Sequence, residues 1–274
     1  MVGMHRSGTA LVARLVRALG VDLGRRISDN AEDIGVVDLH EQLMRRAGGS
    51  WEYPQPLLEL LEVPEFRREA TRRVARYAAR HRSAEGLWGW KDPRGAFTLP
   101  LWRDVCGTVP MVVVRRDGRD VAASLAHRAR VALQRGEGPF AERSLIRGVA
   151  DALRHRGQLR FDTVRCWSPD RALALWGEYN AAIDRHLERC DDPVLALRHE
   201  DLVADPREQA RRLADFLGAP PAGAEKTLQG LALRPAARRA ALQPSAGATR
   251  AVVGLLRRYG YEVEADDERL VRSG

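Results

Sequence analysis

The sequence contains little cysteine, almost no lysine and no long apolar run. Its three cysteines, Cys106, Cys166 and Cys190, are an odd number at wide spacings without a C-x-x-C pair, which argues against a disulfide framework or a zinc site. The apolar stretch 109–114 is far too short for a transmembrane helix, and the first residues show no signal-peptide pattern. We therefore expect a cytoplasmic protein without a transmembrane segment.

The basic residues are almost all arginine. Of 45 basic residues only Lys91 and Lys226 are lysines, and the net charge is +8. Such lopsided usage is typical of genome composition bias, so the basic charge does not indicate a nucleic-acid partner. The positive charge still favours anionic ligands. The arginines of 64–81 are likewise interpreted first as a solvated helix face, with an acidic glycan or membrane surface as the alternative. A lysine retained in such a chain is of interest because its compact amine can be aimed at one atom.

The order of predicted elements indicates an α/β fold. With 274 residues, 45% of them apolar, the chain is long enough for a sizeable core, and no linker divides it, so we predict one domain over 1–274. The β-branched run 109–114 is typical of a parallel strand covered on both faces. Further strands are expected at 1–3, 87–90 and 193–197, and helices at 9–19, 36–46, 64–81, 118–133, 170–189 and 249–258. Residues 134–169 are interpreted as a long loop or insertion. This alternation predicts a parallel sheet flanked by helices.

One further helix has clear start and stop signals. Asp205 is a candidate N-cap, Pro206 occupies the first helical position, and Glu208 completes a capping box. Gly218 marks its end.

The most specific local motif is GMHRSGT, at residues 3–9. It stands between a strand and a helix, where backbone N–H groups and a helix N-terminus form a cradle for anions. Gly3 and Gly8 have the glycine spacing of a nucleoside-triphosphate loop, but Thr9 replaces its lysine and Ala10 its metal-binding hydroxyl. The alternative is a tight turn without a ligand.

A second motif, RRDGRDVAAS, begins where the strand at 109–114 ends. Arg116 lies at this strand end, and Ser124 lies on the face of the following helix that begins beneath a cap at Asp117. Both side chains are therefore predicted to meet one phosphate, by charge and by a hydroxyl hydrogen bond. The alternative is that Arg116 only pairs with Asp120.

A third motif, WGWKDPR, contains one of the two lysines. Lys91 closes a short strand beside two tryptophans and a proline, where partial shielding from water favours a role in neutralising charge on a leaving oxygen. The alternative is a surface ion pair between Lys91 and Asp92.

These three motifs in this order, with LALRHEDLVADPREQARRLADFLG and WGEYNAAI later in the chain, resemble the sulfotransferases that use 3′-phosphoadenosine-5′-phosphosulfate (PAPS), including many bacterial members. The resemblance implies a P-loop-like, three-layer fold. It also implies transfer of a sulfuryl group to a hydroxyl or amine of a small-molecule, lipid or carbohydrate acceptor, leaving adenosine 3′,5′-bisphosphate. It implies no metal and no nucleic-acid partner.

The resemblance also implies roles for individual residues. Arg6 corresponds to the basic residue that contacts the sulfuryl and 5′-phosphate oxygens, and Lys91 to the lysine that assists departure of the phosphate oxygen. Arg116 and Ser124 correspond to the pair that binds the 3′-phosphate. Tyr179, or alternatively Trp176, is expected to face the adenine. The remaining residues of the implied nucleotide site are those of the loop and the helix start, His5, Ser7, Gly8, Thr9 and Ala10.

The general base is not at its usual place in this chain. Pro93 stands where many cytosolic animal members have a histidine base, two residues after the lysine. Relatives closer in pattern carry a glutamate in G-x-x-E, and here that position is Asp38, which is therefore the first candidate. Glu32 and His40 are the nearby substitutes, and the alternative is that Asp38 only caps or solubilises its helix.

Two other functions remain open. A P-loop kinase or NTPase is disfavoured by Thr9 in the lysine position and by Arg115 and Arg116 where a magnesium-binding aspartate is expected. The second alternative is a relative that binds anions but has no catalytic activity. The sequence determines neither the acceptor nor the oligomeric state.

Overall fold

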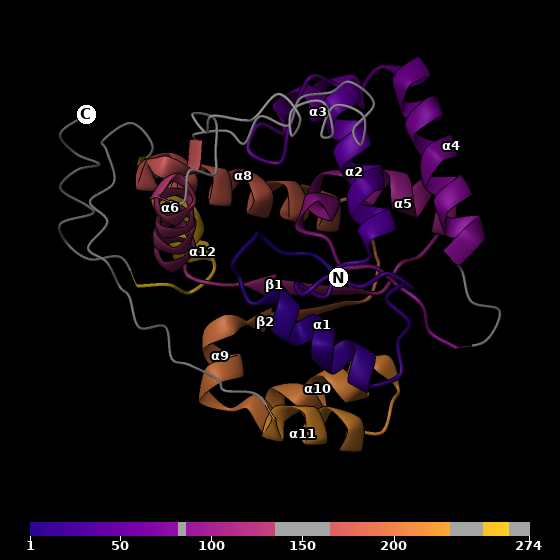
Figure 1. The fold of residues 1–274 in the computed structure, drawn as a ribbon, viewed down its shortest axis with the longest axis vertical. Helices are drawn as coiled ribbons and strands as arrows, with labels where there is room; N and C mark the ends of the chain where they lie inside the picture. The colour runs from indigo at the N-terminus through magenta and orange to yellow at the C-terminus, as the bar shows by residue number, and fades with distance from the viewer. Residues whose placement is uncertain (82–85, 135–164, 231–248, 263–274) are drawn as a thin grey trace. The chain divides into compact units, whose positions relative to one another are not determined.

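The computed structural model describes residues 1–81, 86–134, 165–230 and 249–262 (Figure 1). The chain divides into two compact units, one made of residues 1–117 with 176–237 and the other of 118–175 with 238–274. Each unit is described by itself below, and the single domain expected from the sequence stays a prediction.

A small parallel sheet lies at the centre of the first unit. Strand β1 (Met111–Arg115) pairs with β2 (Val194–Arg198) in parallel, with Met111 opposite Val194. Val2 extends this sheet through a parallel bridge to Val113, and a further parallel bridge joins Asp22 to Trp88. The α/β class is therefore confirmed. The predicted strand at 87–90 contributes only the bridge at Trp88.

One face of the sheet is covered by helices from both ends of the unit (Figure 1). They are α1 (Thr9–Ala18), α9 (His199–Ala204), α10 (Pro206–Leu217) and α11 (Ala222–Gln229). Buried apolar side chains join them to the strands, among them Val12, Leu15, Val112, Val114, Leu197, Leu202 and Leu213. The predicted cap of α10 is confirmed, because Asp205 accepts a hydrogen bond from the Glu208 N–H at 3.0 Å.

The opposite face is covered by segments that lie between α1 and β1 in the chain (Figure 1). They are α2 (Ile34–Arg46), α3 (Gln55–Leu60), α4 (Pro64–His81), η1 (Pro93–Phe97) and α5 (Leu99–Cys106). Helix α4 has the predicted bounds, and its arginines pair with Glu65, Glu69 and Asp104, as expected of a solvated face. Helix α2 begins two residues earlier than predicted because Asp33 caps it by accepting the Gly35 N–H at 2.6 Å.

The second unit is largely helical in its described part. It contains α6 (Gly118–Gln134), η2 (Arg165–Trp167), the start of α8 (Pro169–Leu187) and α12 (Thr249–Arg258). Residue Trp176 and those after it in α8 belong to the first unit. The loop predicted at 134–169 lies mostly outside the described residues. No helix in the described ranges combines the length and apolarity needed to cross a membrane.

Candidate functional site

The predicted site segments of the first unit emerge at one edge of its sheet. The loop at 3–8 follows Val2, Arg116 follows β1, and His199 follows β2. The Met1 nitrogen donates to the Trp90 carbonyl at 2.9 Å, which places the segment ending in Lys91 beside the first residues. Carboxyl ends of parallel strands are where open α/β sheets bind their ligands, so this edge is the candidate site.

Both glycines of the loop are required by close contacts. A Cβ on Gly3 would lie 2.4 Å from the Val114 carbonyl oxygen, and a Cβ on Gly8 would lie 2.6 Å from Nδ1 of His199. Gly8 also has a φ of 91°, and Arg6 has a φ of 68°, both in the left-handed region. The loop therefore brings its backbone close to β1 and to His199 in a conformation that an ordinary side chain would strain.

Unsatisfied polar groups gather where this loop enters α1. Gly8 is the N-cap and supplies no capping side chain, and the first turn has no acidic residue. Ser7 Oγ and His199 Nδ1 are buried without a hydrogen-bond partner among the residues that the structure describes. Burial, and secondly the charge of Arg116, lower the pKa of His199 to about 4. A helix N-terminus with buried polar groups left over fits an anionic group of a ligand.

Arg116 joins this loop to the end of β1. Its Nη1 donates to the Arg6 carbonyl at 3.2 Å, and its own carbonyl accepts from the Trp176 indole at 3.1 Å. The next residue, Asp117, donates its N–H to Glu200 Oε1 at 3.0 Å, which ties this turn to α9. The two turns that the sequence singled out are thus in direct contact. Ser124 is half-buried on α6 in the second unit, so its predicted pairing with Arg116 stays a prediction.

Lys91 is a buried cation held by one carboxylate. Its side chain is 3% exposed, and Nζ donates to Glu32 Oε1 at 2.6 Å and to the Asn30 carbonyl at 3.0 Å. Burial lowers the pKa of Lys91, and the attraction of Glu32 offsets part of this effect. The surface pair with Asp92 considered above is therefore wrong, because Lys91 is buried and pairs with a residue 59 positions away.

A buried network lies directly after Lys91. Asp92 accepts from Arg94 Nη1 at 2.7 Å and contacts His40 Nδ1 at 2.8 Å, while Trp102 donates to His40 Nε2 at 3.0 Å. Since Nε2 accepts, the proton of the neutral ring is on Nδ1 and faces Asp92. Burial alone would raise the pKa of Asp92, but Arg94 and His40 outweigh it and hold that pKa below its usual range.

This network excludes His40 as a general base, because the ring is fully buried and both nitrogens are engaged. Asp38 is exposed on α2. Tyr179 is also fully buried: its hydroxyl donates to the Trp51 carbonyl at 2.9 Å and its ring contacts Phe97. Because Tyr179 is fully buried, its ring has no face open to adenine, and the expected stacking contact disagrees with this packing. Trp176 is equally buried and has no face open to adenine either.

Sequence reasoning missed His199. The residue stands in LALRHEDL directly after β2, so the strand end itself was the available signal, but its contact with Gly8 depends on tertiary structure.

With this geometry established, comparison with known proteins gives the family. A sequence model described as "Sulfotransferase family" matches residues 1–222, which is most of the chain. The chain belongs to the sulfotransferase family. A search of curated proteins found no match. The matched range contains every site segment described here, from the loop at 3–8 to His199, so sulfuryl transfer is the general chemistry that the family supports and the kinase reading is not favoured.

Proposed function

We propose that this sulfotransferase uses PAPS as donor and transfers its sulfuryl group to a hydroxyl or amine of a small-molecule, lipid or carbohydrate acceptor. A P-loop-like three-layer fold and a cytoplasmic location are part of the same proposal. The observation that carries it is the contact between Arg116 and the Arg6 carbonyl, because it unites two cationic turns at one sheet edge. A donor with phosphate at both ends of its ribose needs two such turns.

The residues present fit the donor. The uncapped start of α1, with Ser7 and His199 as buried polar groups, suits the 5′-phosphosulfate, and Arg6 is exposed beside it. Arg116, with Ser124 on the following helix, is proposed to bind the 3′-phosphate. His5, Gly8, Thr9 and Ala10 complete the loop and the first turn. Ala10 has no hydroxyl to offer a magnesium ion, which favours a donor bound without metal.

The chemistry requires a base and a group that stabilises the leaving oxygen. The donor supplies an electrophilic sulfur, and the reaction resembles phosphoryl transfer in relying on in-line positioning and electrostatics. Lys91 stabilises the leaving phosphate oxygen, because a buried ammonium acts more strongly there than in water. Glu32, only 2.6 Å from Lys91 Nζ, accepts the proton of the attacking hydroxyl once Lys91 turns toward the leaving oxygen.

This assignment moves the base from Asp38 to Glu32. The reason is proximity, since Glu32 is buried beside the reacting lysine, whereas Asp38 is exposed on α2. Asp38 stays the alternative, and two amide variants separate them. Glu32→Gln should lower kcat by about 100-fold or more, in the range typical of a general base, while Asp38→Asn should keep most activity. The opposite pattern would return the role to Asp38.

Ligand binding tests the donor class directly. Thermal-shift scans with adenosine 3′,5′-bisphosphate should show stabilisation without metal, whereas ATP with magnesium should add little. Magnesium-dependent stabilisation by ATP alone would contradict the proposal and favour a kinase or NTPase. Binding of the bisphosphate without transfer of sulfate from PAPS to any of a library of hydroxyl and amine acceptors would favour a silent relative.

The two lysines of the chain give a matched pair for the catalytic step. Lys91→Ala should lower kcat far more than affinity for the bisphosphate, because the proposed contact develops in the transition state. Lys226→Ala, at an exposed position on α11, should leave both unchanged. Equal activity of the two variants would contradict the role of Lys91.

A further inference from the structure

A second cluster of chemically active side chains lies at the opposite edge of the same sheet. His186 is in the last turn of α8, and Cys190 and Asp192 follow it in the connection that leads to Val194, the first residue of β2. The donor site proposed above lies at the carboxyl ends of these parallel strands, whereas this cluster lies at their amino ends. It is therefore outside the sulfotransferase site.

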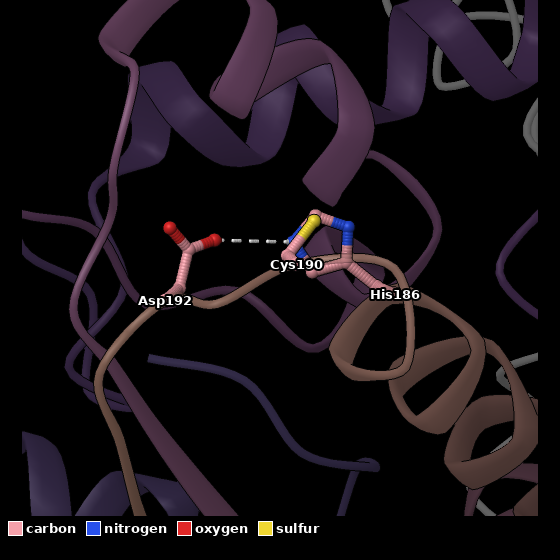
Figure 2. A group of neighbouring side chains, drawn as sticks. All are labelled: His186, Cys190 and Asp192. Atoms are coloured by element: carbon pink, nitrogen blue, oxygen red, sulfur yellow. Dashed lines mark ion pairs between the residues drawn. The ribbon is translucent and has the colours of Figure 1, made fainter.

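The three side chains are neighbours, and the Asp192 carboxylate points toward the His186 ring (Figure 2). Their ligand atoms, an imidazole nitrogen, the thiol sulfur and a carboxylate oxygen, all lie within 4.8 Å of one another. His186 and Asp192 are buried, and Cys190 is half-buried. The His186 Nε2 to Asp192 Oδ2 distance is 3.8 Å. Tetrahedral zinc with bonds of about 2.0–2.3 Å places its ligand atoms roughly 3.4–3.8 Å apart, so the histidine–aspartate pair already has this spacing and any wider pair must close by about 1 Å.

The ligand set is suited to one class of ion. Nitrogen, thiolate and carboxylate ligands together favour zinc and similar borderline divalent ions over magnesium or calcium, which prefer oxygen. With Cys190 deprotonated, thiolate and carboxylate bring two negative charges, which balance a divalent cation. Neighbouring groups already orient the carboxylate, because the Val109 N–H donates to Asp192 Oδ1 at 3.1 Å. Metal-bound carboxylates commonly have such partners.

Arg103 is the main competitor for this carboxylate. Its Nη1 lies 2.6 Å from Asp192 Oδ2. The Arg103 side chain is 35% exposed, so its charge has access to solvent when a cation takes over that oxygen. Arg103 therefore holds the Asp192 carboxylate in place when no metal is bound, and a cation can replace Arg103 at that oxygen.

The cluster opens onto a cavity of about 510 Å³. His186 and Cys190 form part of its wall, together with Arg103, Phe97 and Leu101. Three protein ligands and an open side are the arrangement of zinc sites that keep one exchangeable position. We propose that His186, Cys190 and Asp192 bind one zinc-class divalent cation, with the fourth position facing this cavity and filled by water or a small ligand.

Metal titration of the intact protein tests this site. Zinc added in competition with a chromophoric chelator should bind as one ion per chain, and Co²⁺ should give the visible bands of a tetrahedral ion with a thiolate charge-transfer band. Cys190→Ser and His186→Gln should each weaken zinc binding by more than about 100-fold, beyond the 10- to 100-fold effect of losing an outer partner. Cys106→Ser, at a half-buried cysteine outside the cluster, should bind zinc like the parent protein.

Thiol reactivity gives a readout that does not depend on the folding of any variant. Zinc should protect one additional thiol of the parent protein from a thiol-reactive dye, and peptide mapping should identify it as Cys190. Three results would each overturn the proposal: no zinc binding at micromolar concentrations, equal affinity in Cys190→Ser, or protection of a different cysteine. None of these measurements uses sulfotransferase activity, so the outcome is independent of the proposed donor.

Discussion

Replacing Gly8 by alanine is expected to damage ligand binding more than stability. Gly8 has a φ of 91°, and its added Cβ would lie 2.6 Å from His199 Nδ1, a distance that forces the ring or the loop to move. The left-handed conformation costs an alanine about 1–2 kcal/mol. Displacing the polar groups that we propose to face the donor phosphate should cost a further 1.5–3 kcal/mol of binding free energy, as for hydrogen bonds to charged groups, or roughly 10- to 150-fold in Kd.

Gly20 supplies the matched control for this variant. Its φ is 90°, nearly that of Gly8, but a Cβ there would meet nothing within 4 Å. Gly20→Ala therefore introduces the same backbone strain as Gly8→Ala, at a position just past α1 that does not contact the candidate site. Both variants should lose roughly 2–8 °C in Tm for the shared strain, since 1 kcal/mol corresponds to about 2–4 °C in a chain of this size.

Calorimetric titration with adenosine 3′,5′-bisphosphate separates the two effects. Gly20→Ala should keep the affinity of the parent protein, and Gly8→Ala should lose it by the factor given above. If Gly8→Ala bound the bisphosphate as tightly as Gly20→Ala, the reasoning that places a phosphate against Gly8 and His199 would be refuted.

Three further variants and conditions test other parts of the site. Arg116→Ala should weaken bisphosphate binding by roughly 10- to 150-fold in the same titration, as expected for loss of a charged partner, and an unchanged Kd would contradict the 3′-phosphate assignment. A bound phosphate should raise the pKa of His199 from its value of about 4, so affinity should increase as pH falls from about 7 toward that value, whereas a flat pH profile would argue against the contact. Asp92→Ala should cost about 3–5 kcal/mol in urea unfolding, because it removes one of the two carboxylates that pair with buried Arg94, the other being Glu41, and also removes the acceptor of buried His40 Nδ1. Asp104→Ala at an exposed pair should cost at most about 1 kcal/mol. Since the pKa of Asp92 is held below its usual range, its contribution should be complete above about pH 4 and be lost only in stronger acid.

The elements with local signals were predicted well. Helix α4 and the helix at 249–258 have the predicted bounds, and the Asp205 cap forms as expected, because periodicity and capping are encoded within a few residues. The strand at 109–114 begins only at Met111. Val109, the first residue of the predicted strand, instead donates its N–H to Asp192, which lies 83 positions away and is not indicated by any local pattern.

The arrangement of the candidate site was predicted only in part, for the same reason. The loop at 3–9 and Arg116 each carry a recognisable motif, and the structure brings them together. The partner of Lys91 was not predicted. The alternative considered was a pair with the neighbouring Asp92, but Asp92 contacts His40 and Arg94, and Lys91 pairs with Glu32. Which acidic residue reaches the amine depends on the packing of the segment that follows α1.

The sequence by itself determined which chemical groups are present: a glycine loop before a helix, an arginine at a strand end, and Lys91, one of two lysines in an arginine-rich chain. Tertiary structure alone decided which groups meet. The parallel pairing of β1 and β2 helps to place His199 against Gly8 at one edge of the sheet and Asp192 beside Arg103 at the other. The contacts of Gly8 with His199 and of Arg103 with Asp192 join residues about 190 and about 90 positions apart, so they follow from how whole elements pack and leave no trace in local spacing.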